Sequence, residues 1–510
     1  MKKHFRSLLV LTLFLSGFAA WAGAQDLASF EKRVTKKVLP NGLTVLICGR
    51  HEAPVFSFFT HVDVGSDREV PGITGLAHMF EHIAFKGTDK IGTTNYLAEK
   101  LALAKVEKAY AAYDRERRKE VGSDPKKVAA LEKAWKDAIA AADKYVVKEA
   151  FGEIVERQGG EGLNAFTSSE ETGYFYSFPS NRVELWAYLD SERFLHPVLR
   201  EFYKERDVVT EERRMSAESQ PTGRLIEQFL ATAFVAHPYG QPIVGWPSDL
   251  QSFSATDALK FYRTYYVPSN MVVAVVGDVK PNEVLAIVEK YFGRLPARPR
   301  PEPLRTAEPA QNAERTVVLH EASQPFYVEG YHKPDARDPD DAVYDVIQDL
   351  MSTGRTSRLY RALVRDKKLA AYSGGFNGFP GQKYPSLFVF FAVPTPGHKP
   401  AEVRAAVQEE ITRLKNEDVS DDELKMVKTR AKAALLRKLD NNQGLALEMG
   451  IAESLFGDWR ELFRRVEKID KVTAADVRRV ANKTFVDSNA TLGYLESTQL
   501  AGSPAKEVQQ

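Results

Sequence analysis

Short runs of apolar residues, separated by turn-forming residues, predict the strands of this chain. Residues 36–49, "KKVLPNGLTVLICG", indicate a strand beside an Asn-Gly turn signal, and residues 55–66, "VFSFFTHVDVGS", indicate a second strand rich in Val and Phe. Strand-like sequence returns at residues 163–179. Residues 270–279, "NMVVAVVGDV", are apolar almost throughout, which is typical of a buried strand.

Other segments repeat apolar residues at helical spacing. Helices are predicted at residues 75–87, 181–195 and 201–220. From Leu101 to about Arg157 the chain is rich in Ala, Lys and Glu with helical periodicity, and the stretch is interrupted by Gly122-Ser123-Asp124-Pro125. This pattern predicts two helices joined by a turn, a charged helical hairpin inserted at about 101–157.

A proline-rich segment separates two parts of the chain that share the same order of elements. Residues 296–313 contain five prolines among Arg and Glu, which predicts a stiff, extended linker. Beyond it the order strand, strand, helix, strand, strand recurs, at residues 315–323, 324–334, 340–352, 370–379 and 386–394. We therefore expect an internal duplication: an α+β fold made of two homologous α/β sandwich halves, residues 25–295 and 314–510.

Composition narrows the class of protein but not its substrate. The chain has 510 residues, of which 44% are hydrophobic and 27% charged, as in a globular protein with more than one domain. Lys plus Arg number 70 and Asp plus Glu number 69, so nothing indicates nucleic acid or an anionic membrane as partner. The one cysteine, Cys48, excludes a disulfide framework and a cysteine-based metal site.

The first residues have the pattern of a secretory signal. Three basic residues precede an apolar run from Leu8 to Ala20, and the segment ends in Ala22-Gly23-Ala24. We expect residues 1–24 to be a signal peptide cleaved after Ala24, with an uncleaved anchor as the alternative. No later stretch is apolar enough to cross a bilayer, so no stable membrane anchor is expected.

The predicted helix at 75–87, "GLAHMFEHIAFKG", carries the candidate chemistry. His78 and His82 are one helical turn apart on one face, and Glu81 lies beside them. Two imidazoles can hold one cation while the carboxylate takes a proton from water, and the His-x-x-Glu-His order is the inverzincin signature. The pattern alone also fits an ordinary solvated helix face. The surrounding apolar residues favour a buried site, in which ionisable groups need partners.

A zinc hydrolase also needs a third protein ligand, and "FYKERDVVTEERRM" offers candidate glutamates. Three stretches together, "GLAHMFEHIAFKGT", "GGEGLNAFTSSEETGYFYSFP" and "YKERDVVTEERR", resemble the pitrilysin/insulinase family of zinc metallopeptidases, in particular bacterial chains similar to mitochondrial processing peptidase. In that family the third ligand is the glutamate seven residues after the Glu of a Glu-Arg pair. The pair here is Glu205-Arg206, so the resemblance implies Glu212 as the ligand and not its neighbour Glu211.

The resemblance implies roles for the remaining site residues. One Zn²⁺ per chain would be held by His78, His82 and Glu212, with Glu81 as the catalytic base and Glu205 orienting a ligand histidine. The edge strand at Asn164, Ala165 and Phe166 would bind an extended peptide, and Arg365 and Tyr372 of the second half would clamp the substrate. Without the resemblance, Asn164–Phe166 would be an ordinary strand of a hairpin, Arg365 a surface residue and Tyr372 a core residue.

One departure from the family pattern concerns spacing. From His82 to Glu212 is 130 positions, longer than in typical relatives, and the excess coincides with the predicted hairpin. An insertion between anchored elements costs little if its ends stay close, so the zinc site should survive it. The hairpin itself is open to three readings: an arm that contacts a partner, a gate over the active site, or a solvated decoration.

Together these features predict a secreted zinc endopeptidase whose two halves form a clamshell around a chamber for peptides or unfolded segments. The resemblance implies a homodimer, or a heterodimer with a related chain, and the periplasm of a Gram-negative bacterium. Arg365 and Tyr372 would come from the other half or from a partner chain. The alternatives are a non-catalytic or partner-dependent subunit of a peptidase complex, and a zinc hydrolase acting on a non-peptide bond.

Overall fold

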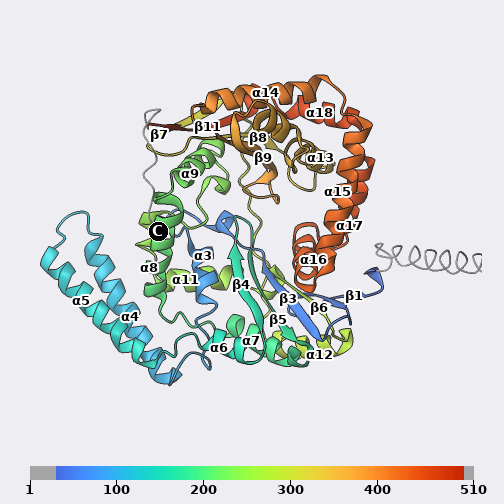
Figure 1. The fold of residues 1–510 in the computed structure, drawn as a ribbon. Helices are drawn as coiled ribbons and strands as arrows, with labels where there is room; N and C mark the ends of the chain where they lie inside the picture. Colours follow the sequence, from blue (N-terminus) through green and yellow to red (C-terminus); the bar gives the residue numbers. More distant parts are fainter. Residues whose placement is uncertain (1–29, 499–510) are drawn as a thin grey trace, which may run out of the picture.

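Two β-sheets, one in each half of the chain, organise residues 30–498, which are the residues described by the computed structural model (Figure 1). The expected signal peptide, residues 1–24, lies outside them. The first sheet has the strand order β1-β2-β6-β3-β5-β4 and the second the order β7-β11-β8-β10-β9. The strands are β1 Val34–Val38, β2 Thr44–Gly49, β3 Val55–Val62, β4 Glu161–Thr167, β5 Thr172–Pro179, β6 Met271–Gly277, β7 Arg315–Glu321, β8 Phe326–Lys333, β9 Ala370–Phe379, β10 Ser386–Pro394 and β11 Ala490–Ser497.

The two sheets have the same topology. In the first, β2 pairs parallel with β6, and β6, β3, β5 and β4 then pair antiparallel in turn. In the second, β7 pairs parallel with β11, and β11, β8, β10 and β9 follow antiparallel. Strand β1 is the one addition in the first sheet. The internal duplication and the α+β fold of two α/β halves are therefore confirmed, and β9 occupies in the second half the edge position that β4 occupies in the first.

Helices cover both faces of both sheets. The helices of the first half are α3 Leu76–Ile83, α4 Tyr96–Arg117, α5 Pro125–Ala142, α6 Ala150–Arg157, α7 Val183–Leu195, α8 Phe202–Arg213, α9 Pro221–Ala233, α10 Pro247–Leu250, α11 Ala255–Tyr265 and α12 Pro281–Phe292. Those of the second half are α13 Asp341–Ser352, α14 Pro400–Asn416, α15 Asp421–Asp440, α16 Asn442–Phe456, α17 Glu461–Lys471 and α18 Ala474–Thr484.

The halves exchange one helix each. Alternate residues of the first sheet, such as Leu46 and Phe59, form a core with Ala446 and Met449 of α16, which belongs to the second half. Alternate residues of the second sheet pack in the same way against α9 of the first half, which contributes Leu225, Phe229 and Ala233. Figure 1 shows α9 beside β7 and β11, and α16 beside β3. The central strands, such as β6, are thus buried on both faces, which explains their continuous apolar sequence.

The predicted helical hairpin exists, but its limits differ from those expected. Helix α4 begins at Tyr96 because the Asn95 side chain accepts a hydrogen bond from the backbone of Ala98, and α5 ends at Ala142. Residues 150–157 form a separate helix, α6, which contacts β4 and is buried through Phe151 and Val155. The hairpin proper therefore spans 96–142, where we had expected 101–157.

The hairpin is anchored at its base and solvated at its tip. Tyr110 of α4 and Trp135 of α5 are buried in the main core of the first half, and the Arg206 guanidinium of α8 lies over both rings. At the turn, by contrast, Val121 is 90% exposed. The hairpin, seen projecting from the body in Figure 1, is therefore tied to the helix that carries Glu205 and Glu212.

Residues 293–314 contain no helix or strand, and the proposed linker 296–313 lies within them. This segment is held by contacts along its length, since Arg300 forms a 2.8 Å ion pair with Asp63 and the Glu308 carboxylate accepts hydrogen bonds from three successive backbone N–H groups at 235–237. Within residues 30–498, no helix combines the length and the apolar character needed to span a bilayer.

Candidate metal centre

Helix α3 begins where a buried carboxylate replaces a conventional cap. Its N-cap residue, Gly75, has φ 93°, a left-handed conformation that favours glycine, and its own side chain can offer no cap. The Glu69 carboxylate instead accepts hydrogen bonds from the backbone N–H groups of Gly75 and Ala77, both at 2.7 Å. Apolar residues on the other face, including Met79 and Phe80, are buried, which fixes the rotation of the helix and turns His78 and His82 toward α8.

Helix α8 presents Glu205 and Glu212 to α3. The two residues are seven positions apart and so lie on one face. The Glu212 carboxylate faces both imidazoles: its Oε1 is 3.5 Å from Nε2 of His78, and its Oε2 is 3.4 Å from Nε2 of His82. Glu211 points away, is exposed, and forms an ion pair of 2.6 Å with Arg214. Adjacent glutamates therefore have different surroundings, as the resemblance implies.

The donor set fits one tetrahedral zinc ion. One ligand atom from each of His78, His82 and Glu212 can be chosen so that all three lie within 4.8 Å of one another. Zinc holds nitrogen and oxygen ligands at about 2.0–2.2 Å in tetrahedral sites, so neighbouring ligand atoms stand about 3.3 Å apart. Each ring nitrogen lies near that distance from one oxygen of Glu212, His78 at 3.5 Å from Oε1 and His82 at 3.4 Å from Oε2. Two imidazoles and one carboxylate also leave a fourth position open, as catalytic zinc requires.

The surroundings of the two imidazoles differ. Nδ1 of His82 lies 3.4 Å from Oε2 of Glu205, whose other oxygen pairs with Lys86, so that Nε2 of His82 is turned toward Glu212. Burial opposes the charged form of His82, but the hydrogen bond to Glu205 and the charges of the nearby carboxylates outweigh it and raise its pKa. His78 is more deeply buried, and this burial, with the charge of His82, lowers its pKa to about 4.

Glu81 lies next to this cluster and is held by a residue that sequence reasoning missed. The Thr167 hydroxyl, at the end of β4, donates a 2.7 Å hydrogen bond to Oε2 of Glu81. Burial raises the pKa of the Glu81 carboxyl, although this hydrogen bond and His82 act in the opposite direction. A lone threonine on a strand carries no sequence signal. Its position two residues after Ala165, on the same face of β4, is the clue that could have found it.

A cavity of about 290 Å³ opens beside Glu81 and His82. Its walls come from the end of α3, the segment before α6 and the start of α8, and its lining combines apolar with charged side chains. The residues that line it are Glu81, His82, Phe85, Lys86, Val146, Val147, Lys148, Glu149, Ala150, Arg200, Glu201 and Glu205. Space for a bound group thus exists directly next to the candidate base.

The structure brings the expected peptide-binding strand to this site. β4 is the edge strand of the first sheet and contacts α3. Asn164 is exposed, Ala165 is buried, and the Phe166 ring stacks on Phe59 with their centroids 6.1 Å apart. The unpaired side of β4 can accept another strand.

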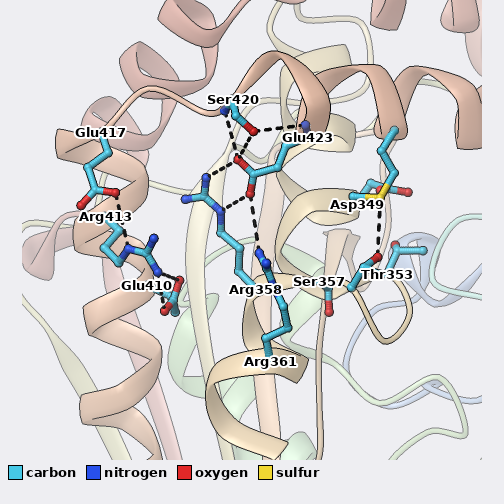
Figure 2. A network of polar contacts seen from close by, with 12 residues as sticks. Asp349, Thr353, Ser357, Arg358, Arg361, Glu410, Arg413, Glu417, Ser420 and Glu423 are labelled. Carbon is cyan, nitrogen blue, oxygen red and sulfur yellow. Dashed lines mark hydrogen bonds and ion pairs between the residues drawn. The ribbon is translucent and has the colours of Figure 1, made fainter. Parts of the chain in front are cut away.

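Arg365 and Tyr372 belong to the second half, and among the described residues neither forms a hydrogen bond or ion pair with α3, α8 or β4. Arg365 pairs with its neighbour Asp366 at 2.6 Å, and Tyr372 is 59% exposed on β9. Arg365 belongs to a π-helical segment, Tyr360–Asp366. Figure 2 shows the anchor that precedes it: Arg358 donates two 3.0 Å hydrogen bonds to Glu423 at the start of α15.

Comparison with known proteins covers both halves. The family model described as Insulinase (Peptidase family M16) matches residues 47–117 and 140–246, and the model described as Peptidase M16 inactive domain matches residues 252–431. The first match breaks off between 117 and 140, which contains the turn after α4 and most of α5. Relative to the family model, the inserted part of the hairpin is thus the turn after α4 and most of α5.

Individual relatives cover nearly the whole chain. A zinc protease of Helicobacter pylori, PqqE, is 28% identical over 510 aligned residues, which span 97% of this chain and 100% of that protein. A probable mitochondrial-processing peptidase subunit beta of Arabidopsis thaliana is 26% identical over 490 residues, 93% of this chain and 80% of that protein. The crystal structure of a protease from Helicobacter pylori superposes with a TM-score of 0.76 at 27% identity, covering 91% of this chain and 99% of that one. The chain belongs to the insulinase family, peptidase family M16, as its motifs indicated.

Proposed function

We propose that this chain is a zinc-dependent endopeptidase in which His78, His82 and Glu212 hold one Zn²⁺. The observation that carries the proposal is the convergence of three ligand atoms within 4.8 Å, with the Glu81 carboxylate on the same helix turn. When bound, zinc lowers the pKa of a coordinated water and polarises the peptide carbonyl. Two relatives that are named as zinc proteases support the same proposal.

Glu81 acts as the general base in this proposal. Thr167 binds Oε2 of Glu81, and among the described residues no hydrogen bond reaches Oε1, which is left to accept a proton from the attacking water. The same carboxyl then delivers the proton to the leaving amine. The raised pKa of the Glu81 carboxyl suits both proton transfers. The closer the pKa of this group lies to neutral pH, the more readily it both accepts and donates a proton there.

The substrate is proposed to be a peptide or an unfolded segment. An extended chain can pair with the free edge of β4 at Asn164–Phe166, and the cavity beside Glu81 can take a side chain of the substrate. We further propose that the two halves, which are joined at α9 and α16, form a chamber around the site that disfavours a folded protein as substrate. We also propose export to the periplasm, with a mature chain that begins at Gln25.

The clamp residues favour a dimer. Because Arg365 pairs with its neighbour Asp366 and Tyr372 is exposed on β9, with no hydrogen bond or ion pair to the metal ligands among the described residues, we propose that a partner supplies the clamp, either a second copy or a related chain. The alternative, a partner-dependent or non-catalytic subunit, draws support from two comparisons: the inactive-domain family model that matches residues 252–431, and the Arabidopsis relative that is named as a subunit.

Metal binding tests the ligand assignment. Glu212→Gln is expected to raise the Kd for zinc by more than about 100-fold, because a ligand carboxylate is lost, and Glu205→Gln by about 10- to 100-fold, because His82 loses its orienting partner. Glu211→Gln is the matched control, since Glu211 faces Arg214 and not the cluster. Competition with a chelator of known affinity gives the three constants. Equal weakening by Glu211→Gln and Glu212→Gln would contradict the assignment.

Zinc affinity is expected to depend on one proton between about pH 5 and about pH 6.5. His78, with a pKa of about 4, is already neutral there, whereas the raised pKa of His82 means that zinc must displace a proton from this ring. Affinity should therefore fall about tenfold for each unit that the pH is lowered. Calorimetry in buffers of different ionisation enthalpy counts the released protons, and a count of two would show that both rings are protonated before binding.

Catalysis is tested by Glu81→Gln. The purified mature chain is expected to cleave peptides from an unbiased library, and the variant is expected to retain zinc while its kcat falls about 100- to 10,000-fold, because the base is lost and the ligands are not. Hydrolysis is followed by mass spectrometry, with metal content measured on the same samples. A variant as active as the parent chain would exclude Glu81 as the base. Zinc-loaded chains that cleave nothing alone would favour the subunit alternative.

Mixing two inactive variants tests the source of the clamp. If a second copy supplies Arg365, then Glu81→Gln and Arg365→Ala chains should each be inactive alone, and their mixture should regain about a quarter of the parent activity. Half of the randomly mixed dimers would contain both chains, with one complete site in each. Absence of any recovery, with mixed dimers demonstrated by mass, would show that the clamp is not shared in this way.

A further inference from the structure

The hydrogen bond between Thr167 and Glu81 joins two elements that the proposed reaction uses separately, the peptide-binding strand and the base. Thr167 ends β4, and its hydroxyl lies 2.7 Å from Oε2 of Glu81. We propose that Thr167 is a positioning residue for Glu81, and that the second half of the chain holds Thr167 in place through Glu170. This inference rests on the proposed function of Glu81 as the base.

The turn after Thr167 is fixed from the first half. Residues 168–171 connect β4 to β5, and the short helix η1, Ser66–Arg68, lies against them. The backbone N–H of Ser66 donates to the carbonyl of Ser168 at 3.3 Å, and that of Asp67 donates to the carbonyl of Ser169 at 2.8 Å. The segment that follows η1 supplies Glu69, the carboxylate at the start of α3. The strand that carries Thr167 and the helix that carries Glu81 are thus tied to one short segment.

The same turn is also held from the second half. Oε1 of Glu170 accepts a 2.6 Å hydrogen bond from the backbone N–H of Lys383, in the loop between β9 and β10 of the second half. The Tyr239 hydroxyl, which belongs to the first half, donates to the same oxygen. At Gly381 of this loop, a Cβ would collide with the Glu170 carboxylate. The backbone of the loop therefore lies directly against this carboxylate at a position that has no room for a side chain. The Lys383 ammonium pairs in addition with Asp63 at the end of β3.

These contacts form a short path between the junction of the halves and the base. The loop at 381–383 holds Glu170, Glu170 holds the turn, and the turn fixes the last residue of β4 against Glu81. A glutamate side chain has several rotatable bonds. A hydrogen bond to one carboxylate oxygen of Glu81 favours the rotamer that directs the other oxygen toward the attacking water. Separation of the halves would remove the Lys383 donor and leave Thr167 less firmly placed. The path therefore makes the base best ordered when the two halves are together.

Substitution of Thr167 tests the first step. Thr167→Val keeps the shape of the side chain and removes the hydroxyl, so kcat is expected to fall about tenfold or more while KM and zinc content change little. Thr167→Ser, which keeps the hydroxyl, should retain activity within about threefold. Crystal structures should show Glu81 in one rotamer in the serine variant and in several in the valine variant. Full activity and a single Glu81 rotamer in Thr167→Val would overturn the proposal.

A double-mutant cycle tests the second step. If Glu170 acts through Thr167, Glu170→Ala should lower kcat in the parent chain but add nothing in Thr167→Val. Glu171→Ala is the matched control, because this neighbouring carboxylate pairs with His61 of its own half, and its effect should be independent of Thr167. Effects of Glu170→Ala and Thr167→Val that multiply would show that Glu170 does not act through Thr167, and would overturn the second step.

Glu81→Gln, measured alongside, separates the inference from the function on which it rests. If Glu81→Gln is as active as the parent chain, the proposed function and this inference both fail. If Glu81→Gln is inactive and Thr167→Val is fully active, the function stands and the inference alone is overturned.

Discussion

The packing of α3 against α8 is the constraint on which the rest of the candidate site depends. A tetrahedral zinc ion demands ligand atoms about 3.3 Å apart, and here they come from residues 130 positions apart in the chain. The apolar face of α3 and the buried residues of α8 set this spacing, so that Glu212 faces both imidazoles. The hairpin that lengthens the connection leaves the spacing intact, because its base is packed against α8 by Tyr110, Trp135 and Arg206.

The exchanged helices explain how the two halves can cooperate without a continuous core. Each sheet needs a cover for its second face, and the cover comes from the other half, α16 for the first sheet and α9 for the second. Burial of these faces holds the halves together at two places, while the polar contacts of Lys383 with Asp63 and Glu170 lie close to the turn beside the base. Apolar packing thus holds the halves together, and the polar contacts of Lys383 lie close enough to the β4–β5 turn to affect the position of Thr167.

Helical spacing and strand alternation were sufficient to predict much of this structure from sequence. The pairing of His78 with His82, with Glu81 beside them, follows from one turn of helix, and the repeated element order indicated the duplication that the two sheets confirm. The expected place of Glu212 depended on the family resemblance, because spacing alone does not choose between it and Glu211. The structure places its carboxylate facing both rings.

Other features were beyond the reach of sequence patterns, for physical reasons. The apolar stripes of α9 and α16 show that they are buried, but not which sheet each one covers. The start of α4 depends on a hydrogen bond from the backbone of Ala98 to the side chain of Asn95, one of several polar residues that could have capped it. The residue type of Thr167 does not mark it, since its hydrogen-bond partner Glu81 lies on a helix 86 positions earlier in the chain.

The central claim is that His78, His82 and Glu212 form one zinc site. Diffraction from crystals of the zinc-loaded chain, recorded on both sides of the zinc absorption edge, tests it most directly. One anomalous peak per chain is expected, about 2.0–2.2 Å from Nε2 of each histidine and from a carboxylate oxygen of Glu212. A chain that contains zinc but shows its anomalous peak elsewhere, or shows that peak without Glu212 as a ligand, would contradict the account.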